Sequence, residues 1–412
     1  MASLDLLLLA VFWLSLSSLA HQDGLRSKRQ AMNLRDPKSK RWDNDRNGGY
    51  IPYKLSGFNH TDQAKIRLVL QFWQDHACIQ FREDPYHQHP IDFVNGGWSG
   101  GCKSQVGKTP DNSYNRQTVQ LGWDCMAFGT ISHEVGHALG LIHAHSRHDR
   151  DDYITLQRSN LRSSGNEFFR KFSTLENDNL GIPYDYGSIM HYGGLIRQYS
   201  INPQLPVITA NYGNGLYKNT MGQNTQPTLL DTLAINRLYQ CDYKCQGIQT
   251  LCHHGGYVNP KNCAKCICPW GYGGDRCETR DPGSNSSSTC GADLWANGNW
   301  QILEAIVGST EQDLKIRHDH CHWHIRAQGN QKVQIRVDQL SSHWYNGVPE
   351  LTAPGCEVNN VEFKMMNDVT KTGYRFCISE TGTVMTSEGQ LAIVSAYARG
   401  YQKFRISYKA VY

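Results

Sequence analysis

The pattern of hydrophobic and polar positions predicts one amphipathic helix early in the chain. Between residues 62 and 75, apolar side chains recur at helical spacing and place Ile66, Val69, Leu70 and Trp73 on one face. Thr61 or Asp62 is the residue type that caps the start of such a helix. We therefore expect a helix that packs this face against a core.

Other segments predict turns and strands. The glycine-rich residues 95–102 are typical of a turn, or of a strand open to close backbone approach. Residues 118–123 alternate as a strand does. Near the C-terminus the alternation is clearer, and its apolar positions are Val333, Ile335, Val337, Phe404, Ile406 and Tyr408. This period of two predicts that residues 290–412 form an all-β sandwich.

The first twenty residues predict a secretory signal peptide. Leu6 to Leu16 is almost wholly apolar, and Ser18-Leu19-Ala20 places small residues where signal peptidase cuts. The segment carries Asp5 and no Lys or Arg, so an uncleaved membrane anchor is the alternative. Its apolar core is shorter than the roughly 20 residues of a spanning helix. Nothing after residue 20 is apolar enough to span a bilayer, so we expect a secreted, extracellular protein without a membrane span.

A basic cluster follows the predicted signal peptide. Arg26-Ser27-Lys28-Arg29 is the kind of sequence that processing proteases cut, which predicts a pro-segment removed by an activating protease at Arg29. A second basic cluster occupies residues 38–41, and the alternative is that both belong to an exposed tail. The overall charge is mixed, with 41 Lys and Arg against 37 Asp and Glu, which gives no case for a nucleic-acid partner.

Fourteen cysteines, an even number, predict disulfides, because secretion exposes thiols to oxidising conditions. They fall into three groups along the 412 residues, and each group is even and can close on itself. This grouping and the length suggest three domains. The groups are Cys78, Cys102, Cys125 and Cys241; Cys245, Cys252, Cys263, Cys266, Cys268 and Cys277; and Cys290, Cys321, Cys356 and Cys377.

The segment HEVGHALGLIH, residues 133–143, concentrates candidate chemistry. His133 and His137 are four apart and share one face of a helix, and Gly140 can adopt the positive φ that ends it. His143 can then turn back, and three neutral imidazoles leave one zinc coordination position open for water. Zinc lowers the pKa of that water towards about 7, and Glu134 can take its proton as a general base. The alternative is a helix that carries His and Glu by chance.

A second motif, Ser188-Ile189-Met190-His191-Tyr192, lies downstream. HExxHxxGxxH followed by a methionine turn resembles the metzincin metalloproteases. Residues 143–151 and the SIMHY turn resemble the astacin family in particular. The resemblance covers residues 49–241 and implies an α+β catalytic domain with one zinc ion.

The resemblance also implies roles for individual residues. His133, His137 and His143 match the zinc ligands of the family. Tyr192 matches a further ligand of the resting enzyme, which moves aside when substrate binds and helps to stabilise the tetrahedral intermediate. Met190 would form the apolar floor beneath the metal. The implied disulfides are Cys78–Cys241 and Cys102–Cys125.

Two positions depart from the family pattern. The family usually has Glu directly after the third histidine, where it anchors the new N-terminus after activation, but this chain has Ala144. The family pro-segment often blocks zinc with Asp in an FxGD context, whereas this short segment has only Asp23. Both departures concern activation and latency, and neither touches the zinc ligands.

The remaining cysteine groups resemble two smaller modules. The crowded group ends in CICPWGYGGDRC and resembles an EGF-like module, which implies Cys245–Cys263, Cys252–Cys266 and Cys268–Cys277. Residues 290–412 resemble a CUB domain, which implies Cys290–Cys321 and Cys356–Cys377. Neither module shows the acidic residues of its calcium-binding relatives, so we expect no calcium. Residues 281–289 have the composition of a flexible linker.

Three further observations concern single side chains. His318, His320, His322 and His324 share one face of a strand, which we expect to be a solvated polar face, with a secondary metal site as the alternative. The sequons at Asn59 and Asn285 are candidate glycosylation sites. The histidines expected to be structural or superficial are His76, His87, His89, His145, His148 and His191.

Taken together, the sequence predicts a secreted zinc endopeptidase that cuts extracellular proteins positioned by its EGF-like and CUB-like modules. The alternative is an inactive protease fold that acts as an extracellular binding scaffold. Its mark would be a lost ligand or base, and none is lost. The expected organisation is a signal peptide at 1–20, a pro-segment at 21–29, an astacin-like domain at 30–241, an EGF-like module at 242–278, a linker at 279–289 and a CUB-like domain at 290–412.

Overall fold

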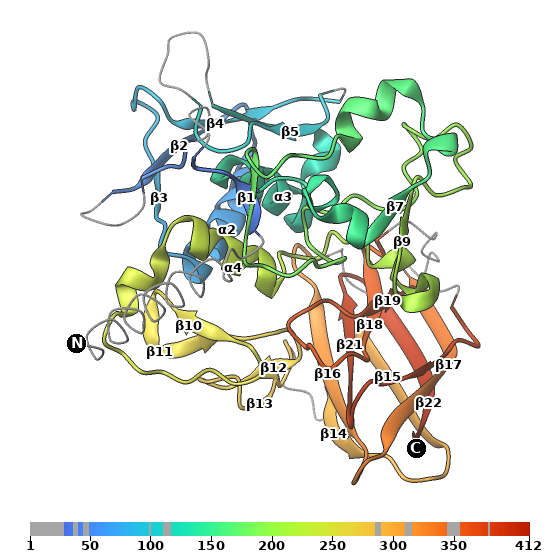
Figure 1. The fold of residues 1–412 in the computed structure, drawn as a ribbon. Helices are drawn as coiled ribbons and strands as arrows, with labels where there is room; N and C mark the ends of the chain where they lie inside the picture. Colours follow the sequence, from blue (N-terminus) through green and yellow to red (C-terminus); the bar gives the residue numbers. More distant parts are fainter. Residues whose placement is uncertain are drawn as a thin grey trace, which may run out of the picture.

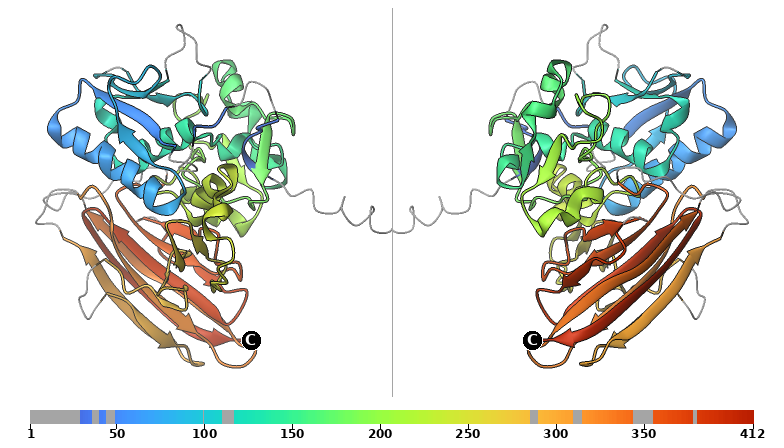
Figure 2. Two further views of the ribbon diagram at one scale, coloured as in Figure 1. Left: turned by 90° about the vertical axis from the view of Figure 1, so that its left-hand side faces the viewer. Right: turned by 90° about the vertical axis from the view of Figure 1, so that its right-hand side faces the viewer.

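The computed structural model describes residues 29–35, 40–43, 49–98, 100–109, 117–284, 290–309, 315–343, 355–377 and 380–412. The expected signal peptide, most of the pro-segment and the sequon at Asn285 lie outside these residues. A mixed helix and sheet domain lies over a small β-rich module and a larger β-sandwich (Figures 1 and 2). Within the described part of the chain, no helix combines the length and apolarity needed to cross a membrane.

A five-stranded sheet forms one half of the N-terminal domain, which extends to residue 241 and is termed the catalytic domain after its predicted zinc motif. Its order is β3-β2-β4-β6-β5, and only the pairing of β5 with β6 is antiparallel. The predicted strand at 118–123 is observed as β6, and the described part of the glycine-rich segment, residues 96–98, 100 and 101, lies between β4 and β5. The strands are β2 (Ile51–Ser56), β3 (Phe81–Glu83), β4 (Ile91–Asn95), β5 (Cys102–Ser104) and β6 (Thr118–Leu121).

Helix α2 (His60–His76) confirms the predicted amphipathic face, because Ile66, Val69, Leu70 and Trp73 are all buried. The predicted cap was wrong. Asn59 is the N-cap, and its Oδ1 accepts the Asp62 N–H at 2.9 Å. Asp62 itself lies in the first turn, where a carboxylate favours the positive end of the helix dipole.

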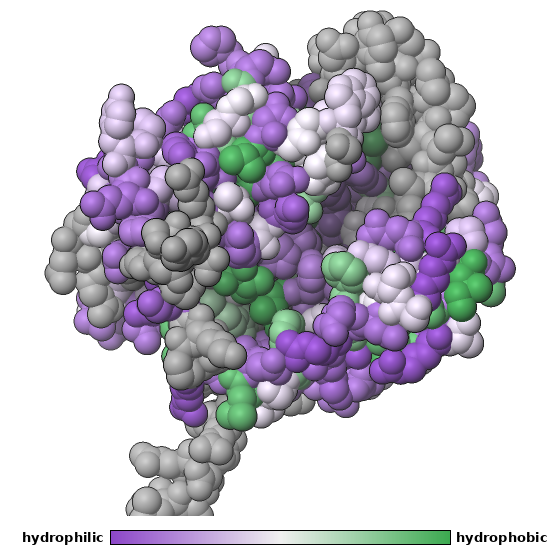
Figure 3. All heavy atoms as spheres, turned by 90° about the horizontal axis from the view of Figure 1, so that it is seen from above, coloured by the Kyte–Doolittle hydropathy of each residue, from purple (hydrophilic) through white to green (hydrophobic). Residues whose placement is uncertain are grey.

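The second half of the catalytic domain is built from loops, short ribbons and helix α4 (Leu229–Leu238). Strand β1 (Arg29–Met32) pairs with β8 (Asn177–Leu180), and β7 (Ile154–Leu156) pairs with β9 (Ile208–Ala210). Ala31 and Met32 are buried in the catalytic core. The chain just after Arg29 is therefore part of this domain. Seen from above, the surface is mostly hydrophilic and is hollowed near its centre (Figure 3).

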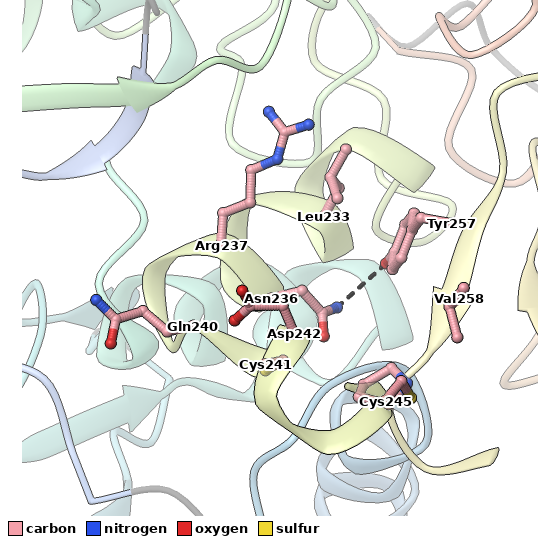
Figure 4. Close-up of a pocket in the computed structure, with 10 residues that line it drawn as sticks. Leu233, Asn236, Arg237, Gln240, Cys241, Asp242, Cys245, Tyr257 and Val258 are labelled. Atoms are coloured by element: carbon pink, nitrogen blue, oxygen red, sulfur yellow. Dashed lines mark hydrogen bonds between the residues drawn. The ribbon is translucent and has the colours of Figure 1, made fainter. Parts of the chain in front are cut away.

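The small module packs against α4 through one aromatic residue. The Tyr257 hydroxyl donates to Thr232 Oγ1 at 2.8 Å. It also accepts from Asn236 Nδ2 at 3.2 Å (Figure 4). A pocket of about 440 Å³ lies beside this contact. The strands of the module are β10 (Tyr257–Asn259), β11 (Asn262–Ile267), β12 (Tyr272–Gly273) and β13 (Thr279–Arg280).

The C-terminal domain is a sandwich of two sheets, as its alternation predicts. The residues that point inward are apolar, and Val333, Ile335 and Ile406 are fully buried. One sheet contains β14 (Ala292–Trp295), β16 (Asp319–Arg326), β21 (Leu391–Ala398), β18 (Asn359–Lys364) and β19 (Tyr374–Phe376). The other contains β15 (Gln301–Gly308), β22 (Tyr401–Val411), β17 (Lys332–His343) and β20 (Val384–Thr386).

All fourteen cysteines form disulfides, and the pairs coincide with those that the family resemblances imply. They are Cys78–Cys241, Cys102–Cys125, Cys245–Cys263, Cys252–Cys266, Cys268–Cys277, Cys290–Cys321 and Cys356–Cys377. The small module has three cross-links because a domain of its size buries little apolar core.

The expected solvated histidine face was wrong for His322 and His324 on β16, which are each only 1% exposed. His318 and His320 are partly buried. The small module covers the buried end of this face, and the Gly271 carbonyl lies 2.9 Å from His324 Nε2. Alternation along a strand identifies its two faces, but it does not show which neighbouring module covers the outer one.

Buried polar contacts join the sandwich to the catalytic domain. Arg375 on β19 pairs with Glu362 on β18 at 3.1 Å, and both side chains are fully buried. The same guanidinium donates to Thr225 Oγ1 at 2.7 Å and Gln223 Oε1 at 3.2 Å in the catalytic domain. A cation buried at this boundary is tolerable because Glu362 neutralises it and the catalytic domain supplies further acceptors.

Replacing Arg375 by Met tests this contact. Glu362 would be left buried without its cation, so we expect the free energy of unfolding to fall by about 3–5 kcal/mol. Urea denaturation measures the change. In the control Arg375→Met/Glu362→Leu, most of that loss should be recovered, because no unpaired charge remains. A single variant as stable as the wild type would contradict the assigned pairing.

Candidate metal centre and active site

Helix α3 (Phe128–Leu139) presents the first half of the centre. Its apolar residues Ile131, Val135 and Leu139 are fully buried and fix the helix against the core. The helix must also end directly after Leu139. Gly140 ends it with a φ of +110°, as the sequence predicts. The chain then reverses and brings His143 back to the helix.

The three motif histidines converge on one point. His143 Nε2 lies 3.1 Å from His137 Nε2 and 3.3 Å from His133 Nε2. His133 Nδ1 lies 2.7 Å from the Ile189 carbonyl, and His137 Nδ1 lies 2.8 Å from the Leu141 carbonyl. A carbonyl only accepts, so these Nδ1 atoms carry the protons and the Nε2 lone pairs face one another. Without a metal ion these lone pairs repel one another, so the arrangement fits a bound cation.

The protonation state of the rings agrees with this donor set. Burial lowers the pKa of His133, lowers the pKa of His137 to about 3, and holds the pKa of His143 well below its usual range. Neutral imidazoles are the form that binds metal. Three of them match zinc, with a fourth coordination position left for water.

The methionine turn, residues 188–192, packs against α3 next to the three histidines. Met190 is fully buried, and its carbonyl accepts the Ala144 N–H at 2.8 Å. A Cβ on Gly136 would lie 2.9 Å from Met190 Sδ, so the glycine allows the turn to approach α3. At Ala144 the family carboxylate is replaced by a buried methyl group.

Asp231 on α4 holds this turn in place, and sequence reasoning missed it. Its Oδ1 accepts the Ser188 hydroxyl at 2.6 Å, and its Oδ2 accepts the Ile189 N–H at 2.8 Å. The side chain is fully buried. Asp231 also forms a capping box with Thr228, and this spacing was the one local signal. It predicts a helix start but not a contact with residues 188–189.

Glu134 and Tyr192 lie beside the three histidines. Glu134 is 5% exposed, and its Oε2 has no hydrogen-bond partner among the described residues. Burial raises the pKa of this carboxyl to about 8, a shift that a nearby cation opposes. The Tyr192 ring centroid lies 4.4 Å from that of His143 and 4.2 Å from that of the buried His145. Burial raises the pKa of Tyr192 to about 12, so the hydroxyl remains a donor at neutral pH.

Comparisons with known proteins agree with this geometry. A sequence model of the Astacin peptidase family matches residues 35–240. The zinc metalloproteinase nas-27 of Caenorhabditis elegans is 33% identical over 376 residues, which cover 88% of this chain and 84% of nas-27. The zinc metalloproteinase nas-31 of the same organism is 34% identical over 94% of this chain, but the match spans only 59% of nas-31.

Among solved structures, high choriolytic enzyme 1, a hatching-enzyme zinc-protease of Oryzias latipes, is 30% identical. The match covers 51% of this chain and 98% of that protein, with a TM-score of 0.44. The family match, the histidine centre and the relatives together define a zinc metalloendopeptidase. The chain belongs to the astacin family.

Replacing Asp231 by Ala tests the support of the methionine turn. The Ser188 hydroxyl, the Ile189 N–H and the Thr228 N–H would lose their acceptor, so we expect a loss of about 1–3 kcal/mol in unfolding free energy. Because the turn carries a carbonyl that orients His133, zinc affinity should also fall by about 10–100-fold. Competition with a chelator measures this affinity. Asp242→Ala, an exposed carboxylate on the following turn, is the control and should change neither quantity.

Proposed function

We propose that this chain is a secreted endopeptidase that cuts extracellular proteins, with Glu134 as the general base. The observation that carries the proposal is the Glu134 carboxylate, buried beside three converging imidazoles with an unpartnered oxygen. Cystine pairing of every cysteine supports an oxidising compartment. A scaffold without activity is not favoured, because each expected ligand and the base are present.

In the proposed reaction, His133, His137 and His143 would hold zinc, and Tyr192 would be a further ligand in the resting state. The metal would supply a water of lowered pKa and polarise the substrate carbonyl. Glu134 would accept the proton of the attacking water as the water oxygen bonds to the carbonyl carbon. Glu134 would then pass this proton to the amide nitrogen as the C–N bond breaks, which gives a carboxyl group and an amine.

Tyr192 is the proposed hydrogen-bond donor to the substrate carbonyl oxygen, on which negative charge develops in the transition state. The hydroxyl is protonated at neutral pH, and the ring lies against both His143 and His145, so Tyr192 can donate a hydrogen bond to this oxygen once it has left the resting-state zinc. Met190 contributes packing rather than a ligand, because its side chain is buried between α3 and the turn.

Two covalent changes belong to the same proposal. An activating protease would cut at Arg29 and release the pro-segment, while the buried Ala31 and Met32 remain with the catalytic core. A glycan would occupy Asn59, which is exposed and whose Oδ1 keeps its capping bond when Nδ2 is modified. Asn285 is the second candidate and lies outside the described residues.

Replacing Glu134 by Ala tests the general base. We expect peptide hydrolysis to fall by about 10²–10⁴-fold while the zinc content stays at one ion per catalytic centre. The processed protein is assayed with a peptide substrate, and its metal is quantified in parallel. Glu134→Gln, which keeps the shape without the basic oxygen, should be equally impaired. Activity retained in both variants would refute the assignment.

Replacing Tyr192 by Phe tests the proposed oxyanion donor. Loss of one donor that acts in the transition state should lower kcat by about 10²-fold and change KM little. Steady-state kinetics of the processed protein separate the two constants. Tyr199→Phe is the control, because Tyr199 lies in the same aromatic cluster and is only partly buried. Equal effects of the two substitutions would point to packing instead.

A further inference from the structure

A second group of metal-binding side chains lies far from the active-site histidines in the fold. His320 and His322 on β16 face Asp281, the residue that follows β13 of the small module. One ligand atom from each residue lies within 4.8 Å of the other two. Only two of the four strand histidines take part, because His318 and His324 contact the carbonyls of Glu357 and Gly271.

The distances in this group are too long for hydrogen bonds. Asp281 Oδ2 lies 3.8 Å from His320 Nε2 and 3.7 Å from His322 Nε2. An N–H···O bond needs about 2.7–3.2 Å between heavy atoms. A tetrahedral zinc ion with bonds of about 2.0–2.1 Å separates neighbouring ligand atoms by about 3.3–3.4 Å. The carboxylate is therefore spaced from each ring nearly as two ligands of one ion are, and the ligand atoms of the two rings lie within 4.8 Å of each other.

Neighbouring groups orient these ligand atoms. His322 Nδ1 shares a hydrogen bond of 2.7 Å with Ser395 Oγ, which leaves Nε2 to face Asp281. Asp281 Oδ1 accepts the Gly283 N–H at 2.8 Å, which leaves Oδ2 to face the two rings. Metal ligands are typically held by such outer hydrogen bonds. The nearby Arg280 is neutralised by Asp293, whose Oδ2 lies 3.3 Å from its Nε.

Burial and access also suit an ion. The His322 side chain is 2% exposed, whereas His320 and Asp281 are 33% and 30% exposed. The group thus has a fixed, dry side and an open side through which an ion and a water ligand can enter. Two imidazoles and one carboxylate favour zinc over calcium, which takes six to eight oxygen ligands.

We propose that Asp281, His320 and His322 form a second zinc site that clamps the segment after the small module to the sandwich. Asp281 belongs to one side of this junction and the two histidines to the other. The segment is already fixed here, because the Ser284 N–H donates to the His320 carbonyl at 3.0 Å. Zinc at this position would stabilise the arrangement of the two modules and would take no part in peptide hydrolysis.

Zinc titration of the full processed protein with its catalytic zinc tests the proposal. At micromolar free Zn²⁺ we expect a second zinc ion per chain and a rise in melting temperature. Asp281→Asn and His320→Ala, both at partly exposed positions, should each weaken the second site by at least about tenfold. Hydrolysis of a short peptide should not change in either variant.

Glu304→Gln is the control. It removes an exposed carboxylate of the same sandwich that lies on β15 of the other sheet and pairs with Lys403 at 2.7 Å. This variant should bind the second zinc as the wild type does. The proposal is overturned if the wild type binds only one zinc, or if the second zinc is insensitive to the Asp281 and His320 substitutions.

Discussion

The chain reversal at Gly140 is the constraint on which the zinc centre depends. Its φ of +110° strains any residue with a side chain, and a Cβ there would lie 2.9 Å from both Leu238 Cδ2 and Met32 Cε. Gly140 therefore ends α3 and lets Leu238 of α4 and Met32 of β1 pack closely against the backbone. The reversal also directs His143 towards the other two histidines. Packing and metal geometry are decided by one backbone conformation.

Buried polar groups connect the zinc centre to the neighbouring helix and the catalytic domain to the sandwich. Asp231 connects α4 to the methionine turn, and Arg375 connects the sandwich to the catalytic domain. Burial of Asp231 or Arg375 is favourable only where its hydrogen-bond partners are in position. These contacts therefore specify one arrangement of the domains rather than simply adding stability. The relative positions of the modules follow from fixed hydrogen bonds at their boundaries.

Local sequence determined much of this structure. Apolar period identified the buried face of α2 and the inner face of the sandwich, because the spacing of side chains on a helix or strand is set by backbone geometry. The HEVGHALGLIH spacing brought His133, His137 and His143 together for the same reason, with Gly140 supplying the turn. The cap of α2 was predicted at Thr61 or Asp62 and is Asn59, because several neighbouring residues have capping side chains.

Only the tertiary structure decided which distant residues complete these sites. Asp231 lies 43 residues beyond Ser188 in the turn that it holds, and nothing in its own segment marks that contact. His322 and His324 on β16 were expected in solvent, but they are buried, and the fold brings Asp281 to His320 and His322. Periodicity describes how a segment divides its own side chains between two faces. What each face meets depends on the packing of elements that are remote in sequence, which no local pattern encodes.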